Sequence, residues 1–267
     1  MSRVAISCCC IDLQVRSRTK SKRPSCHWSR KVDLLVVWGE GAIAAKKLAV
    51  GVPTVFISIG YPVELGLVQS LAHPGGNMTG ITAEAALETP AKRLQILKEI
   101  VPELKHVAVL GPVDDPAFVE KGLQDLAARE LAVTLMPVVI KSADDLEAAF
   151  TSMKKDGAQA VMPIRTSLTF VLGKEIADHA LAAHFPSCWP FRQAVMAGGL
   201  VSLDPDRLAM TRPAAAQIDK IIKGTSPADI PVEQPSRFEL YVNLKTARLL
   251  GLTIPPSLLG RADEVIE

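Results

Sequence analysis

The stretch Val32-Asp33-Leu34-Leu35-Val36-Val37-Trp38-Gly39-Glu40-Gly41 decides the fold class of this chain. Its apolar run, interrupted only by Asp33, is typical of a strand buried on both faces, and it stops at a glycine-rich turn. An alanine- and lysine-rich stretch follows to about Val50 and predicts a helix. A buried strand that leads through a short turn into a helix is the repeating unit of a parallel α/β sheet.

The same pattern recurs along the chain. Strands are predicted at 53–58, 106–110, 133–140 and 158–164, and each is followed by a predicted helix, at 63–71, 116–129, 143–155 and 168–183. Parallel strands joined by helices need crossover connections, which are almost always right-handed. The sequence therefore predicts an α/β fold of doubly wound, Rossmann-like lobes with parallel sheets.

Three segments interrupt the alternation, at residues 78–82, 198–203 and 237–243. Each leaves one α/β region and enters the next, so we interpret them as crossings between two lobes. We assign residues 32–82 and 204–238 to lobe 1, and residues 83–203 and 239–267 to lobe 2. Three crossings would leave a cleft that the loops at the strand ends enter.

Composition and charge exclude several classes of protein. The chain has 267 residues, of which 48% are hydrophobic and 22% charged, as in folded globular proteins. Its net charge is +2, but residues 1–31 hold eight Lys/Arg against one Asp, which gives +7 and leaves −5 for the rest. We expect residues 1–31 to be a disordered basic leader. The remainder has no basic stripe, and aromatic residues make up only 4%, so we expect no nucleic-acid partner.

The sequence also lacks the motifs of membrane spans and of enzymes. No apolar run of 18 residues predicts a membrane span, and the N-terminus lacks a signal-peptide pattern, so a chain made as written would stay in the cytoplasm. The five histidines have no metal-ligand spacing. A nucleophile elbow, a phosphate loop and a dinucleotide-binding fingerprint are all missing. We therefore predict no enzyme, no catalytic residue, no metal and no cofactor.

Candidate ligand-binding residues follow the predicted strands of lobe 1. Glu40 and Gly41 lie where a strand meets a helix, and the amide groups at a helix start favour an anionic ligand group. The alternative interpretation of Glu40 and Gly41 is an ordinary turn between a strand and a helix, without a ligand. Ser58, Gly60 and Tyr61 end the next strand, where the tyrosine ring could stack on an aromatic ligand or stay a half-exposed loop residue.

Lobe 2 offers candidates in the corresponding places. Asp114 could accept hydrogen bonds from an ammonium group of the ligand. Arg165 and Thr166 could bind a carboxylate, although Thr166 also suits a helix cap. Phe191 could form an apolar wall or pack in the core, and Arg192 could contact an anion or remain solvent-exposed.

Two long motifs carry a resemblance to a known family. The first comprises residues 61–71 and 74–81, and the second comprises residues 222–235, 238–240, 243–247, 251–259 and 262–267. Both are similar to bacterial ABC-transporter substrate-binding proteins, in the group with tryptophan- and phenylalanine-binding members and the type I periplasmic binding protein fold. The resemblance implies the solute-binding component of an ABC importer, with an ABC permease as partner and a periplasmic or lipid-anchored location. It also implies that a small organic ligand, an amino acid or an aromatic acid, is enclosed in the interlobe cleft by hinge closure.

The chain departs from this family pattern at its beginning. Met1–Arg30 stands where members have a signal and two further strand–helix units, so we expect lobe 1 to be incomplete. Tyr61 stands where many members have Asp, and Glu40 and Gly41 stand where they have a small hydroxyl residue. Two alternative functions stay open: a sensory or regulatory ligand-binding module on the same fold, and a non-functional truncated remnant.

Overall fold

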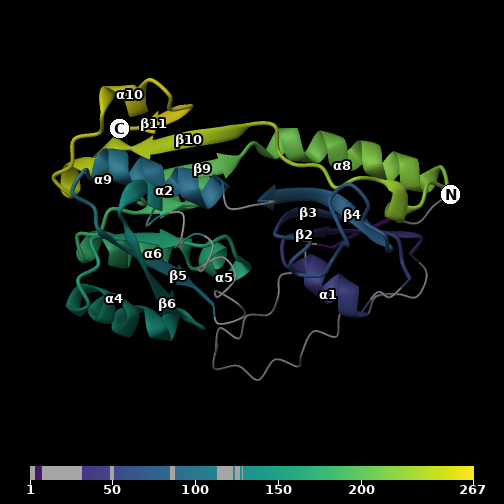
Figure 1. Cartoon of the computed structure of the whole chain (residues 1–267), viewed down its shortest axis with the longest axis horizontal. Coiled ribbons are helices and arrows are strands. Elements are labelled where there is room, and N and C mark those ends of the chain that lie inside the picture. The colour runs from purple at the N-terminus through teal and green to yellow at the C-terminus, as the bar shows by residue number, and fades with distance from the viewer. Residues whose placement is uncertain are drawn as a thin grey trace. The chain divides into compact units, whose positions relative to one another are not determined.

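The computed structural model describes residues 4–7, 32–48, 51–84, 88–112, 123, 127 and 129–267. The chain divides into two compact units (Figure 1). Unit 1 comprises Met1–Ala86 and Pro205–Arg237, and unit 2 comprises Leu87–Asp204 and Phe238–Glu267. The lobe boundaries assigned from the sequence, at residues 82, 203 and 238, stay a prediction, because the two units are defined by compactness alone.

Unit 1 contains one sheet of strand order β1-β2-β3-β4 in which neighbouring strands are parallel. Its strands are β1 (Val4–Ser7), β2 (Leu34–Trp38), β3 (Thr54–Gly60) and β4 (Met78–Glu84), and its helices are α1 (Gly41–Leu48), α8 (Arg207–Ile222) and the 3-10 helix Pro227–Asp229. The predicted α/β class with parallel sheets is confirmed.

Helices α1 and α8 cover opposite faces of this sheet. Leu35 and Val37 of β2 belong to the apolar cluster that includes α1, whereas Leu34 and Val36 belong to the cluster that includes α8. Consecutive strand residues point to opposite faces, so burial on both sides requires apolar residues at every position. This packing explains the unbroken apolar run of β2.

Strand β1 differs from the disordered leader that we expected. Val4–Ser7 pair in parallel with β2, Val4 opposite Leu34. The edge of a buried strand would otherwise present a row of unpaired N–H and C=O groups, and a short segment containing Val and Ile is well suited to pair with it. The rest of that prediction, residues 1–3 and 8–31, lies outside the described residues.

Unit 2 contains two strand groups, of order β6-β5-β7 and β11-β10-β9-β8. A parallel bridge between Val161 and Ser187 joins them, with the Val161 N–H donating to Pro186 O at 2.9 Å. The strands are β5 (His106–Gly111), β6 (Thr134–Val139), β7 (Ala160–Pro163), β8 (Cys188–Trp189), β9 (Val201–Pro205), β10 (Phe238–Asn243) and β11 (Glu264–Ile266). Through the bridge, β7, β8 and β9 become successive neighbours.

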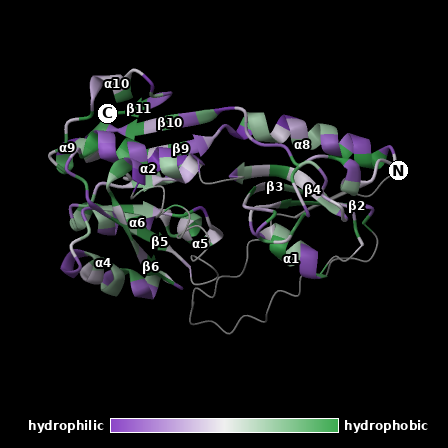
Figure 2. Ribbon diagram, viewed as in Figure 1, coloured by the Kyte–Doolittle hydropathy of each residue, from purple (hydrophilic) through white to green (hydrophobic). Residues whose placement is uncertain are grey.

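Helices complete unit 2 around an apolar core. They are α2 (Glu88–Ile100), the 3-10 helix Ala143–Asp145, α4 (Leu146–Lys155), α5 (Ser167–Val171), α6 (Gly173–Ala182), α7 (Arg192–Met196), α9 (Leu244–Leu249) and α10 (Pro256–Leu259). Leu94 and Leu97 of α2 are fully buried in the cluster that holds Val107 of β5 and Val242 of β10. Figure 2 shows hydrophobic colouring along β3 and β5 and mixed colouring on helices such as α8.

Gly80 marks a close approach between β3 and β4. Its φ is +156°, and a Cβ atom at this position would lie 2.0 Å from the carbonyl oxygen of Phe56. On the other side of β4, the Glu233 N–H donates to Gly80 O at 3.0 Å. Backbone therefore confines Gly80 on both sides, and only glycine fits.

We expect Gly80→Ala to lower the free energy of unfolding by about 3 kcal/mol or more, because backbone atoms must move to admit the methyl group. Gly157→Ala is the matched control. Its φ is +82°, and no atom lies within 4 Å of the point that the added methyl group would occupy, so it should cost only about 1–2 kcal/mol of left-handed strain. Thermal unfolding followed by circular dichroism measures both, and equal losses would contradict the close approach.

Candidate functional site

In unit 1 the candidate residues lie at the carboxyl ends of two neighbouring parallel strands. Glu40 follows β2, and Gly41 is the first residue of α1. The turn between β2 and α1 is closed by hydrogen bonds from the Gly39 N–H to Ile57 O (2.8 Å) and from the Ala42 N–H to Gly39 O (3.1 Å). The first bond ties the end of β2 to β3. The amino end of a helix carries a partial positive charge, so this edge of the sheet favours an anionic group.

The end of β3 is strained. Ser58 and Tyr61 have φ values of +64° and +50°, a region that residues other than glycine rarely adopt. Pairing with β4 slips at this point, where Ile57 opposes Ile81 but Ile59 already opposes Thr82, so Ser58 is an extra, bulged residue. Backbone strain of this kind persists only where surrounding contacts impose it, and it is enriched at ligand sites.

Contacts with β4 impose this strained conformation. The Tyr61 N–H donates to Glu84 O at 2.7 Å, and the Thr82 hydroxyl lies 2.8 Å from Ile59 O and 3.0 Å from Glu84 O. Thr82 is fully buried. The sequence pointed to Ser58, Gly60 and Tyr61 as the end of a strand, but it carried no signal for the left-handed backbone.

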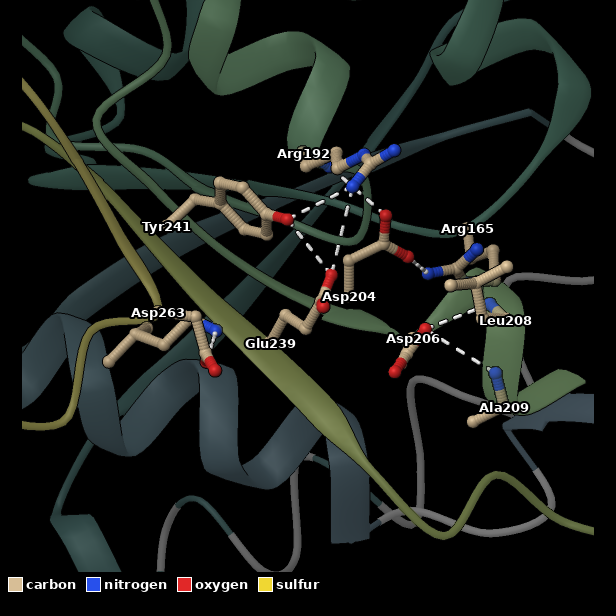
Figure 3. Close-up of polar contacts among 10 residues, drawn as sticks. Arg165, Arg192, Asp204, Asp206, Leu208, Ala209, Glu239, Tyr241 and Asp263 are labelled. Carbon is tan, nitrogen blue, oxygen red and sulfur yellow. Dashed lines mark hydrogen bonds and ion pairs between the residues drawn. The ribbon is translucent and has the colours of Figure 1, made fainter.

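In unit 2 Arg165 follows β7 and forms a buried ion pair with Asp204 of β9 (Figure 3). Its Nη2 atom lies 2.6 Å from Asp204 Oδ1, and the two side chains are 7% and 5% exposed. The same nitrogen also donates to Pro190 O. The guanidinium carbon lies 4.6 Å from the centre of the Phe191 ring. Arg165 is thus engaged with residues of its own unit.

Asp204 also fixes the loop after β8. Its Oδ2 atom accepts the Arg192 backbone N–H at 3.2 Å. Arg192 is the first residue of α7, and Phe191, the residue that precedes this helix, makes no capping hydrogen bond with its side chain. Asp204 therefore supplies from β9 an acceptor that a helix start needs.

The Arg192 side chain is held by β10. Its Nη1 atom donates to Tyr241 Oη at 3.0 Å, and Tyr241 donates to Glu239 Oε2 at 2.9 Å (Figure 3). Glu239 Oε2 lies 3.8 Å from the same nitrogen, and the Arg192 side chain is 36% exposed. Burial raises the pKa of the Tyr241 hydroxyl above its ordinary value, so it stays protonated and can donate to Glu239. The hydrogen bond with Tyr241 raises the pKa of Arg192 further.

The remaining candidates of unit 2 differ in their surroundings. Thr166 caps α5, since its Oγ1 accepts the Thr169 N–H at 3.2 Å, which is the alternative role considered for it. Phe191 meets the edge of Phe170 at 5.1 Å between ring centres. Asp114 lies outside the described residues.

The structure therefore brings Arg165, Phe191 and Arg192 together around one carboxylate. Sequence reasoning did not select Asp204, Glu239 or Tyr241, which hold them. A signal for all three existed: Asp204 follows the predicted crossing segment 198–203, and Glu239 and Tyr241 alternate along the crossing strand 237–243. Residues at alternating positions of a strand lie on one face, so Glu239 and Tyr241 indicated a polar face on this crossing strand.

Other chemistry finds little support in the described parts of the chain. They hold no group of three or more His, Cys, Asp or Glu side chains placed to bind a metal. Burial raises the pKa of the Cys188 thiol to about 12, which makes it unsuited to act as a nucleophile. No helix among these residues is long and apolar enough to cross a membrane.

Comparison with known proteins gives the family. The family model for ABC transporter substrate binding proteins matches residues 28–266. The chain belongs to this family. The resemblance noted in the sequence is thereby confirmed, and so is the prediction that the chain is not an enzyme, because the family consists of proteins that bind small molecules. Its members are typically periplasmic or extracellular.

A curated relative is consistent with this family. This chain is 24% identical over 229 residues to the tyrosine-binding protein of Clostridioides difficile (strain R20291), an alignment that covers 84% of this chain. The chain spans 64% of the length of that relative.

Two solved structures show the fold. The ABC domain in complex with L-Trp from Streptococcus pneumonia has 24% identity and a TM-score of 0.79, with 89% of this chain and 82% of that chain covered. A conserved domain protein from Vibrio cholerae has the same identity and TM-score, with 88% and 78% covered. The predicted periplasmic binding protein-like fold is confirmed.

We expect Ser58→Gly to raise the free energy of unfolding by up to about 1 kcal/mol, because glycine adopts a φ of +64° without strain. The same change should weaken ligand binding, since the greater backbone freedom of glycine leaves the end of β3 less rigid. His184→Gly is the matched control. His184 is an exposed residue in unit 2 with a φ of +59°, and its replacement should stabilise the chain without changing ligand affinity. A destabilised Ser58→Gly protein would show that the bulge depends on the serine side chain.

Proposed function

We propose that this substrate-binding protein is the solute-binding component of an ABC importer and that it binds a small organic ligand, either an amino acid or an aromatic acid. Membership of the family carries the proposal. A relative described as a tyrosine-binding protein and a fold neighbour solved with L-Trp support an aromatic amino acid as the first ligand to test. An ABC permease as partner, and a periplasmic or lipid-anchored location, belong to the same proposal.

Each unit offers residues at its strand ends that suit such a ligand. In unit 1 the helix start at Glu40 and Gly41 suits an anionic group, and Ser58, Gly60 and Tyr61 supply a rigid turn with an aromatic ring. These residues follow neighbouring parallel strands, so they lie at the same edge of the sheet.

In unit 2 Phe191 would give an apolar contact and Arg192 the cation. Arg192 is the better candidate for a ligand carboxylate than Arg165. A guanidinium group has five N–H donors, of which Tyr241 takes one, and the Arg192 side chain is 36% exposed. Arg165 is buried against Asp204 and would act by holding Phe191. Thr166 and Asp114 complete the proposed set.

Isothermal titration of the purified chain with L-tyrosine, L-tryptophan and L-phenylalanine, and with sugars as the comparison, tests the proposal. We expect at least one aromatic amino acid to bind and to be recovered chemically unchanged. Binding of sugars alone would contradict the proposed ligand class. Conversion of the ligand would contradict a receptor function altogether.

We expect Arg192→Ala to weaken binding of that amino acid about tenfold or more, because a hydrogen bond to a charged group contributes about 1.5–3 kcal/mol. Arg212→Ala serves as the control, since Arg212 is an exposed arginine on α8. Titration of both variants should separate them, and equal affinities would remove Arg192 from the site.

A further inference from the structure

We propose that Asp204 is a positioning residue for ligand binding, whose buried carboxylate holds the loops carrying Phe191 and Arg192 in the arrangement that receives the ligand. This inference rests on the proposed function, because it assigns those two residues to the ligand. Asp204 itself is 4% exposed and has both oxygens engaged within its own unit.

One carboxylate ties three strand ends together. Its Oδ1 accepts from Arg165, which follows β7, and its Oδ2 accepts from the backbone of Arg192, which follows β8. Asp204 lies in β9. The loops after β7 and β8 therefore meet at a single residue of the next strand, and Figure 3 shows Asp204 between the two arginines.

The anchor itself is fixed from another side. Arg93 of α2 is 2% exposed and donates to Leu203 O from Nε at 3.1 Å and from Nη2 at 3.0 Å. The residue before Asp204 is thus bound to a helix of the core. These bonds fix the position of β9. The hydrogen bonds from Asp204 therefore fix the loops after β7 and β8 relative to β9.

A charge at this place needs a reason other than stability. Desolvation largely offsets the attraction in a buried ion pair, and apolar residues of similar volume often stabilise a protein as well or better. A carboxylate, in contrast, offers two acceptors in defined directions and so can orient two loops at once. The groups that it orients are the Arg165 guanidinium, which stacks on Phe191, and the first amide of α7.

The test measures the affinity of the full chain for L-tyrosine and L-tryptophan in a double-mutant cycle. We expect Asp204→Asn to weaken binding at least tenfold. In that background Arg192→Ala should weaken binding by less than a further twofold, because the guanidinium has already lost its position. An Asp204→Asn protein that binds within twofold of the wild type, or two effects that simply multiply, would overturn the proposal.

Asp263→Asn is the matched control. Asp263 also accepts a backbone N–H in unit 2, that of Leu240 at 2.8 Å, and this bond involves none of the candidate residues. Its replacement should lower the melting temperature but leave the affinity within twofold of the wild type. A loss of affinity as large as that of Asp204→Asn would show a general effect of destabilisation and overturn the positioning role.

A second measurement needs no ligand. Hydrogen exchange of the Arg192 backbone amide should accelerate at least tenfold in Asp204→Asn and stay unchanged in Asp263→Asn. If the wild type binds none of L-tyrosine, L-tryptophan and L-phenylalanine, the proposed ligand fails, whereas unchanged exchange in Asp204→Asn would overturn the present inference independently. Should Asp204→Asn not fold, Asp204→Asn with Arg165→Gln removes both buried charges and is expected to show the same losses.

Discussion

Helices that cover both faces of a parallel sheet leave its strand ends as the place for polar chemistry, and the rest of this structure depends on that constraint. In unit 1 the residues of β2 alternate between the cluster with α1 and the cluster with α8, so the strand interior accommodates only apolar side chains. Polar candidates therefore appear where strands stop. Glu40, Ser58 and Tyr61 in unit 1 and Arg165 and Arg192 in unit 2 all follow this rule.

The two units use different means to make their strand ends rigid. In unit 1 hydrogen bonds with β4 hold a strained backbone, which has a bulge at Ser58 and a left-handed Tyr61. Unit 2 uses charge, with Asp204 between Arg165 and the amide of Arg192. A strained backbone persists only where tightly packed neighbours impose it, and a buried charge is tolerated only where its partners are fully paired. Each unit meets the requirement of the device that it uses. Both devices restrict conformational freedom before a ligand arrives, which lowers the entropy lost on binding.

The neighbours of an arginine decide whether it is available to a ligand anion. An arginine after a strand suggests an anion contact, and both Arg165 and Arg192 fit that description in the sequence. Burial and pairing separate them, because the Arg165 side chain is 7% exposed and bonded to Asp204, whereas that of Arg192 is 36% exposed. Chemically identical groups in equivalent positions thus have different neighbours.

The sequence by itself determined the α/β class with parallel sheets, the family and the strand ends at which candidate residues lie, whereas the helix predicted at 63–71 is a series of turns. Those features depend on local periodicity and on motifs, which a single chain records directly. Only the tertiary structure decided that Val4–Ser7 complete a sheet edge, that Ser58 is bulged, and that Asp204, Glu239 and Tyr241 hold the arginines. Each of these depends on a partner distant in sequence: β1 on β2 some thirty residues away, Arg165 on Asp204, and Arg192 on Tyr241. Pairings over such separations arise when the chain folds back on itself, and no local pattern encodes which partner is met.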